Sequence, residues 1–97
     1  MLDKLTAIRE KYLHLEELLA DPGTISDMDR WKRINKEYKA LQPVVEVFTR
    51  YERAHAELAG ARQVLAAESD PDMRALAKEE IELLEPKCES LEEELKV

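Results

Sequence analysis

Apolar residues recur along the chain with the spacing of amphipathic helices. Near the start they are separated by 3, 4, 3 and 4 positions, at Leu5, Ile8, Tyr12, Leu15 and Leu19. Near the end the spacing is 4, 3, 4, 3 and 4, at Ala77, Ile81, Leu84, Cys88, Leu91 and Leu95. Alternation of three and four residues places side chains on one stripe of a helix and is typical of a coiled-coil seam. The pattern predicts a long helix at each end of the chain, and no strand pattern competes with it.

Turn-forming residues divide the chain into three predicted helices, near 3–20, 27–68 and 71–95. The first break is Asp21-Pro22-Gly23, because proline cannot continue a helix and glycine accepts turn conformations. Ser26, followed three residues later by Asp29, resembles a capping box and is expected to open the second helix. The third helix is expected to begin within Asp70-Pro71-Asp72. There the first aspartate caps, the proline fills the first helical position, and the second aspartate suits the positive end of the helix dipole.

The long central helix carries two apolar stripes that are one residue out of phase. The first stripe consists of Trp31, Ile34, Tyr38, Leu41, Val45 and Phe48. The second stripe consists of Val44, Val47, Tyr51, Ala54, Leu58, Ala61 and Leu65. An offset of one residue turns the apolar face by about 100°. We therefore expect this helix to pack against two other helices along its length, with the first helix packed on residues 31–48 and the third on residues 44–65.

Two prolines lie inside predicted helices. Pro43 stands where one stripe gives way to the other, and it either kinks one long helix or opens a new one. A kinked continuous helix is favoured, because residues 36–42 contain no glycine and no cap. Pro86 poses the same question, and a kink is again favoured over a stop. Unbroken, the central helix would span roughly 63 Å at 1.5 Å per residue. We expect an all-α fold, an elongated antiparallel helical bundle with coiled-coil-like packing.

The composition excludes several classes of protein. The 97 residues form one small domain or a piece of something larger, and two glycines and four prolines are too few for a sandwich or barrel. A lone Cys88 cannot form an internal disulfide. Charges among the first ten residues exclude a signal peptide there, and no stretch approaches the roughly 18 uncharged residues of a membrane span. We expect a cytoplasmic chain that does not enter a membrane.

The net charge of −7 is unevenly distributed, with −2 over residues 1–26, +2 over residues 27–67 and −7 over residues 68–97. The middle segment holds a group of bases at helical spacing, here called the basic group: Arg30, Lys32, Arg33, Lys36 and Lys39. These side chains could contact phosphates, for example those of ribosomal RNA. The commoner interpretation is a solvated helix face paired with acidic neighbours. The acidic end of the chain would repel nucleic acid, so free DNA is not an expected partner.

No catalytic, cofactor-binding or metal-binding motif is predicted. His14 and His55 are far apart, and neither has a second ligand at the short spacing of a zinc site. The two glycines are isolated, so there is no glycine-rich phosphate loop. Glutamate runs on exposed helices lack the exclusion of water that a catalytic pair of carboxylates needs. Trp31 and Cys88 lie on seams and are interpreted first as packing residues. The chain alone is not expected to be an enzyme.

Seven short segments occur in a specific order: Leu2-Asp3-Lys4-Leu5, Leu15 to Pro22, Ile25-Ser26-Asp27, Lys36-Glu37-Tyr38, Pro43-Val44-Val45-Glu46, Glu68 to Arg74 and Leu91 to Lys96. Each piece alone is common in helices rich in leucine and glutamate. The ordered set resembles the opening of bacterial class-1 peptide chain release factors, of the release factor one type, over essentially the whole chain. Pro86 departs from the helix expected in that family, which puts the straightness of that helix in question.

The resemblance implies an accessory role in translation termination. Such factors read UAA and UAG with a Pro-x-Thr-type loop and release the nascent chain with a Gly-Gly-Gln loop, and we expect neither loop here. Residues 1–97 are therefore expected to be a single helical N-terminal domain, a fragment of a larger factor without its codon-reading and Gly-Gly-Gln domains. The implied partners are the ribosome, at the base of the large-subunit stalk near ribosomal protein L11 and its ribosomal RNA, and the recycling GTPase release factor three. The basic group is then a candidate RNA-facing surface.

A stand-alone helical adaptor or coiled-coil oligomerisation module would have the same composition. Such a module would pair its seams between chains and form a dimer in solution. A release-factor domain would instead pair them within one chain. The two alternatives therefore differ in the oligomeric state that they predict.

Overall fold

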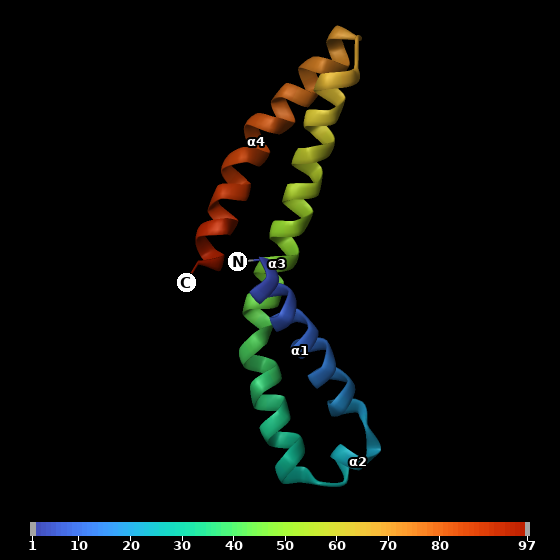
Figure 1. The fold of residues 1–97 in the computed structure, drawn as a ribbon, viewed down its shortest axis with the longest axis vertical. Coiled ribbons are helices and arrows are strands. Elements are labelled where there is room, and N and C mark those ends of the chain that lie inside the picture. Colours follow the sequence, from blue (N-terminus) through green and yellow to red (C-terminus); the bar gives the residue numbers. More distant parts are fainter. Residues whose placement is uncertain (1, 97) are drawn as a thin grey trace. The chain divides into compact units, whose positions relative to one another are not determined.

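The computed structural model describes residues 2–96, and this part of the chain contains helices and no strand. The helices are α1 (Leu2–Ala20), α2 (Pro22–Ile25), α3 (Met28–Ala67) and α4 (Pro71–Leu95). The chain forms two compact units: unit 1 runs to Glu46 and unit 2 begins at Val47. The long helix α3 contributes its first part to unit 1 and its second part to unit 2 (Figure 1). The all-α class and the bounds of the three long helices are confirmed to within a residue.

The predicted break after α1 contains the short helix α2, which the sequence pattern did not reveal. The backbone N–H groups of Thr24 and Ile25 both donate to the carbonyl of Asp21, at 3.0 Å, and that of Ser26 donates to the carbonyl of Pro22 at 3.0 Å. Proline is tolerated at the first position of a helix, where its missing N–H has no intrahelical partner to lose. Pro22 therefore marks the restart of a helix as well as the end of one.

The cap of α3 is Asp27 and not Ser26. The Asp27 carboxylate accepts the backbone N–H of Arg30 at 3.2 Å, and its carbonyl accepts that of Trp31 at 2.9 Å. Ser26 instead ends α2, where its hydroxyl donates to the carbonyl of Gly23 at 2.9 Å. The prediction of a capping box at Ser26 is wrong by one residue, because two successive capping side chains are available and α2 uses the first.

The start of α4 confirms the predicted capping sequence Asp70-Pro71-Asp72. The first carboxylate accepts the backbone N–H of the second aspartate at 3.2 Å, and the proline occupies the first turn. One turn later, the guanidinium of Arg74 donates to the carbonyls of Leu65 and Glu68. These groups lie at the C-terminal end of α3, where carbonyls lack intrahelical partners. Arg74 therefore ties the end of α3 to the first turn of α4.

In unit 1, α1 packs antiparallel to the first part of α3 (Figure 1). The rings of Tyr12 and Tyr38 stack with centroids 4.5 Å apart and planes 11° apart. The Tyr12 hydroxyl donates to that of Tyr38 at 3.0 Å, which donates to the Glu16 carboxylate at 3.3 Å. Nearer the end of α1, the indole N–H of Trp31 donates to the carbonyl of Leu19 at 3.1 Å. These contacts confirm that the first stripe of α3 packs on the seam of α1.

In unit 2, α4 packs antiparallel to the second part of α3 (Figure 1). Phe48, the last member of the first stripe, is buried at the start of this unit. The other buried side chains belong to the second stripe and to the predicted seam: Tyr51, Ala54, Leu58, Ala61, Ala77, Leu84, Cys88 and Leu91. The Arg62–Glu85 pair crosses between the helices at 3.7 Å, but both side chains are exposed, so it adds little. The predicted pairing of the second stripe with the last helix is confirmed.

Neither internal proline breaks its helix. α3 continues through Pro43 and α4 continues through Pro86. Each proline removes one backbone hydrogen bond, to the carbonyls of Lys39 and Glu82, and both of these residues are exposed. Solvent can therefore satisfy the carbonyls that the prolines leave free. The predicted kinks and the arrangement of residues 1–97 as a single domain stay predictions.

One polar side chain is fully buried in unit 1. Thr24, in α2, has no solvent exposure, and among the described residues its hydroxyl oxygen has no hydrogen-bond partner. A buried hydroxyl without a partner costs about 1–3 kcal/mol of desolvation. Replacement by valine keeps the shape and removes that cost.

We expect Thr24→Val to raise the free energy of unfolding by about 1 kcal/mol. The measurement is denaturant unfolding followed by circular dichroism. Thr24→Ser, which keeps the hydroxyl and removes the methyl group, is the matched control and should be destabilising. A loss of stability in Thr24→Val would show that the hydroxyl has a partner.

The adjacent leucines of α4 provide a direct test of the seam in unit 2. Leu84 is 8% exposed on the seam, whereas Leu83 is 74% exposed. We expect Leu84→Ala to lower the free energy of unfolding by about 2–4 kcal/mol. Leu83→Ala should change it by no more than about 0.5 kcal/mol. Equal losses in the two variants, measured by denaturant unfolding, would contradict the assigned seam.

The Tyr38 hydroxyl generates a prediction about pH. Its hydrogen bond with Tyr12, its burial and the negative charge of Glu16 raise the pKa of Tyr38 to about 12. An unfolded tyrosine ionises near pH 10, so the unfolded chain loses its proton first. The contribution of Tyr38 to stability is present below about pH 10 and is lost as the pH rises toward 12.

Removing the carboxylate charge should bring the pKa of Tyr38 down. We expect Glu16→Gln to lower this pKa, measured by the change in the tyrosine ring ¹³C shift with pH. The control is Glu17→Gln, which removes a charge from the next residue, an exposed position. Equal titration of Tyr38 in the two variants would contradict the assigned contact.

Candidate functional site

The basic group occupies the first three turns of α3, within unit 1. Because Asp27 fixes where the helix begins, the position of each base around the helix follows from its number. All five side chains are exposed: Arg30, Lys32, Arg33, Lys36 and Lys39. Helical structure at these positions is confirmed, and none of the five belongs to the seam with α1.

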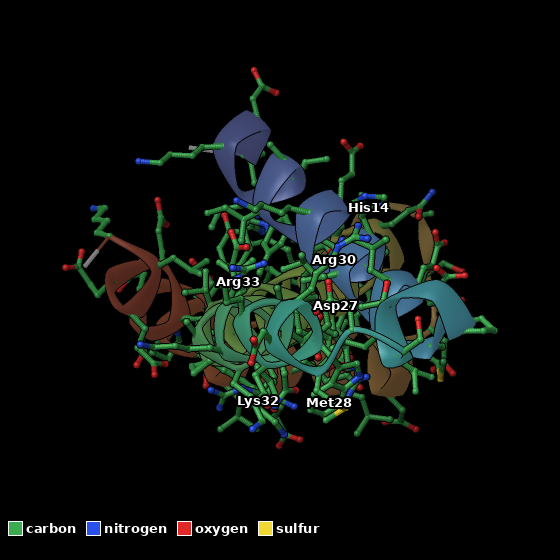
Figure 2. All side chains as sticks on the ribbon, turned by 90° about the horizontal axis from the view of Figure 1, so that it is seen from below. His14, Asp27, Met28, Arg30, Lys32 and Arg33 are labelled. Carbon is green, nitrogen blue, oxygen red and sulfur yellow. The ribbon has the colours of Figure 1, made fainter. Side chains whose placement is uncertain are left out.

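The lysines and the arginines of the basic group lie on different sides of α3. At about 100° per residue, Lys32, Lys36 and Lys39 fall within about 60° of one another, on the side away from the seam. Arg33 lies next to this strip of lysines. Arg30 lies on the side of α3 that is nearer α1, and Lys32 on the other side (Figure 2). The structure therefore gathers the three lysines on one strip and places Arg30 apart from them.

Among the described residues, no member of the basic group forms an ion pair with an acidic side chain. An ion pair in the same unit joins Lys11 of α1 to Glu37 of α3. Asp29 is exposed and lies between Lys36 and Arg33 around the helix. The alternative interpretation, a solvated helix face beside acidic neighbours, stays a prediction, since Asp29 lies among the bases and, in the described part of the chain, forms no ion pair with them. The basic group presents its positive charge to solvent.

An apolar hollow of about 350 Å³ lies beside the N-terminal end of α3. It is lined by Leu19, Ile25, Met28 and Trp31, and Ile25 and Met28 are 49% and 53% exposed. Met28 and Lys32 lie on the same side of α3 (Figure 2). The sequence patterns missed this hollow, because two of its residues flank the cap of α3 outside the seam spacing. The position of Trp31 as a seam residue is confirmed by its bond to α1.

A Pro-x-Thr tripeptide does occur in the chain, contrary to the expectation from sequence. It is Pro22-Gly23-Thr24, and it forms α2. The threonine side chain is fully buried, so its hydroxyl is not available to a nucleotide. The tripeptide therefore has a structural role in turning the chain from α1 into α3.

Two residues of unit 2 have side chains of catalytic types, Cys88 and His55, and both make packing contacts. Cys88 is 5% exposed on the seam, and burial raises the pKa of its thiol. A thiol held neutral in an apolar seam is a poor nucleophile, so the interpretation of Cys88 as a packing residue is confirmed. His55 is exposed, and its ring lies against that of Tyr51, with centroids 4.6 Å apart.

Residues 2–96 contain no cluster of metal ligands. No three His, Cys, Asp or Glu side chains in this range are grouped so that they could hold a metal ion. His14 is exposed on α1, in unit 1, whereas His55 belongs to unit 2. None of the helices described is both long enough and apolar enough to cross a membrane.

Comparison with known proteins identifies a matching family model and relatives that share the same name. The PCRF domain matches residues 8–97. Peptide chain release factor 1 of Bacillus licheniformis is 42% identical over 97 residues, which is 100% of this chain and 27% of that protein. Peptide chain release factor 1 of Amoebophilus asiaticus is 43% identical over 96 residues, 99% of this chain and 27% of that protein. The protein of the same name from Bacillus subtilis is 40% identical over 97 residues, again 100% of this chain and 27% of that protein.

The chain spans about a quarter of the length of these curated relatives. No solved structure matches it significantly. The match to the PCRF domain covers well over half of the chain, and the identity to the relatives extends across both units. The resemblance seen in the order of the sequence segments is thus confirmed, and the chain belongs to the PCRF domain family of peptide chain release factors.

Proposed function

We propose that this chain serves translation termination in the cytoplasm as the helical, ribosome-contacting domain of a peptide chain release factor. The observation that carries this proposal is the identity of 36–43% to proteins named peptide chain release factor 1 across the chain. The two helical units supply solvated surface and no catalytic cluster among the described residues, which suits an accessory domain.

In this proposal, parts of the factor outside residues 1–97 carry out peptide release. The 97 residues contain no Gly-Gly-Gln sequence, and their two glycines are 37 positions apart, at Gly23 and Gly60. The relatives are nearly four times as long, which leaves room for domains that read UAA and UAG and trigger peptidyl-tRNA hydrolysis. In this proposal those domains perform the chemistry, and the present chain helps to hold the factor on the ribosome.

The proposed contact is between the basic group and ribosomal RNA at the base of the large-subunit stalk. Ribosomal protein L11 would lie beside it, and the recycling GTPase release factor three would be a further partner. Support comes from the electrostatics of unit 1, where five cations are exposed and, among the described residues, none forms an ion pair with an acidic side chain. Each lysine or arginine on a phosphate releases bound counterions, so binding through this group should weaken as salt rises.

Reversing the charge of four bases tests this contact. We expect Arg30→Glu, Lys32→Glu, Arg33→Glu and Lys36→Glu together to weaken association with the ribosome, more at low salt than at high salt. If each residue contacts one phosphate, the slope of log affinity against log salt should decrease by about 3 to 4, since each contact contributes roughly 0.7 to 0.9. The measurement is ribosome binding by the labelled chain over a series of salt concentrations.

A second variant with the same net charge separates a local contact from a general effect. It reverses four exposed bases of unit 2, namely Arg50, Arg53, Lys78 and Lys96. We expect it to bind the ribosome more tightly than the unit 1 variant at low salt. Equal affinity of the unit 1 variant and the unmodified chain at low salt would show that the basic group is solvated surface. Equal weakening by both variants would show that net charge alone sets the affinity.

A further inference from the structure

The helix α4 carries a second stripe beside the seam that it buries against α3. The residues Met73, Leu76, Glu80, Leu83 and Lys87 are separated by 3, 4, 3 and 4 positions, which is again the spacing of a coiled-coil contact. Three of them are large apolar residues that stay uncovered: Met73 is 44%, Leu76 is 56% and Leu83 is 74% exposed. The packing of α4 on α3 does not use this stripe.

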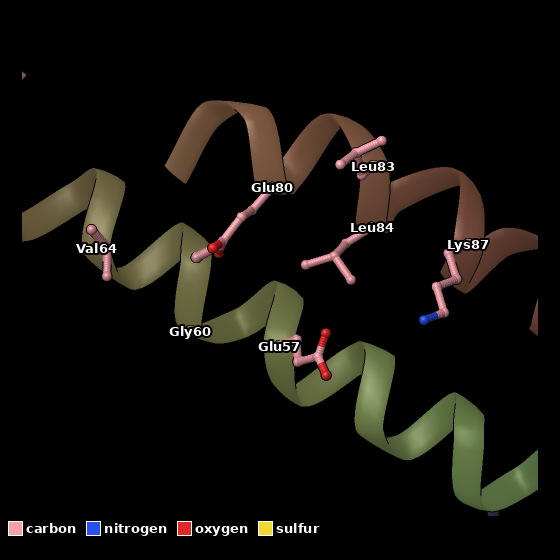
Figure 3. A pocket seen from close by; sticks show the side chains of 8 residues that line it. Glu57, Gly60, Val64, Glu80, Leu83, Leu84 and Lys87 are labelled. Carbon is pink, nitrogen blue, oxygen red and sulfur yellow. The ribbon is translucent and has the colours of Figure 1, made fainter. Parts of the chain in front are cut away.

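The stripe borders an open groove between the two helices of unit 2 (Figure 3). The groove has a volume of about 630 Å³, and α3 lines it with Glu57, Gly60 and Val64 while α4 lines it with Glu80, Leu83 and Leu84. A Cβ atom placed on Gly60 would meet nothing within 4 Å, so packing inside unit 2 does not require a glycine there. Glycine inside a helix costs about 1 kcal/mol relative to alanine.

A groove between two antiparallel helices, bordered by residues at heptad spacing, has the form of a contact surface for a third helix. Side chains spaced three and four apart on that helix would cover Leu83 and Val64. Because Gly60 has no side chain, the backbone of that third helix could approach α3 closely at this point.

The charged residues around this groove indicate what kind of helix would bind there. Glu57 and Glu80 stand on its two sides, and Lys87 lies toward one end (Figure 3). The α4 segment, residues 71–95, carries nine acidic and three basic residues, and all of unit 2 carries thirteen and seven. A second copy of this chain would bring this acidic helix against another like it. An amphipathic helix with lysine or arginine beside its apolar face complements the acidic sides.

We propose that the groove between residues 57–64 of α3 and residues 80–87 of α4 docks a basic amphipathic helix of a partner protein. The apolar face of that helix covers Leu83 and Val64, and its basic residues face Glu57 and Glu80. This surface belongs to unit 2, whereas the proposed RNA contact belongs to unit 1. The inference therefore goes beyond the proposed function and does not depend on it.

A synthetic peptide tests this surface directly. The probe is a fluorescein-labelled helix of about 21 residues, with leucine at the two seam positions of each heptad and lysine at the flanking positions. Lysines on both flanks repel one another and disfavour pairing of the peptide with itself. We expect fluorescence anisotropy to show saturable binding to the full chain that weakens with added salt. A peptide with glutamate in place of each lysine should not bind.

Variants in the groove identify the site. Leu83→Glu places a charge on the apolar wall, and Gly60→Gln fills the open side of the groove with a polar side chain that suits a helix. Each should weaken peptide binding by at least about tenfold. The matched control is Leu13→Glu on α1, where the leucine is 48% exposed in unit 1, and its binding should be unchanged. Circular dichroism verifies that each variant is folded.

Several outcomes would overturn the inference. Equal binding by the groove variants and the Leu13→Glu control would place the peptide elsewhere, and equal binding of the lysine and glutamate peptides would remove the charge argument. Absence of peptide binding would leave the groove without the proposed ligand. A dimer in analytical ultracentrifugation that Leu83→Glu abolishes would identify a second copy as the occupant. In each case the salt dependence of ribosome binding by the basic group would be unaffected.

Discussion

Each unit has only two long helices with which to bury its apolar residues, and this constraint governs the rest of the structure. A helix in a two-helix pair can cover one stripe of its partner, so the side chains at alternating spacings of three and four carry nearly all the burial. In unit 2 the seam members of α4 from Ala77 to Leu91 are buried or half-buried, whereas Leu83, directly beside the seam, is 74% exposed. The order of the apolar stripes along α3 thereby decides which helix packs on which part of it.

Because each unit is a pair of helices with a small interior, the candidate functional residues lie on the surface. A two-helix pair has little interior in which to shield a catalytic group from water. What differs between the units is the charge of the exposed faces: unit 1 has nine acidic and eight basic residues, and unit 2 has thirteen and seven. Unit 1 gathers the unpaired cations of α3, and unit 2 places acids around an uncovered apolar groove. One surface is suited to phosphates and the other to a cationic helix, which is consistent with a domain that works by contact.

Much of the fold follows from local patterns, since spacing and caps act through neighbouring residues. The start of α4 is predictable because Asp70 and Pro71 are local start signals, and both stripes of α3 are read directly from the spacing of its apolar residues. The predicted elements differ from the structure where two local signals compete. Pro22 signals the end of a helix in the sequence although it also starts α2, and Ser26 resembles a cap although Asp27 provides the cap of α3. The spacing of the basic group fixes where its members lie around the helix, whereas the absence of ion pairs to them among the described residues depends on side-chain placement that spacing does not give. The groove at Gly60 depends on which residues of α3 and α4 face each other, and no single helix carries that information.

The central claim is that this chain contacts the ribosome through the basic group of α3. Electron cryomicroscopy of ribosomes halted at a stop codon and saturated with the chain tests it most directly. The account predicts density for the helices at the base of the large-subunit stalk, with Lys32, Lys36 and Lys39 facing ribosomal RNA. Ribosomes without that density, or with the chain bound and this lysine strip turned to solvent, would contradict the account.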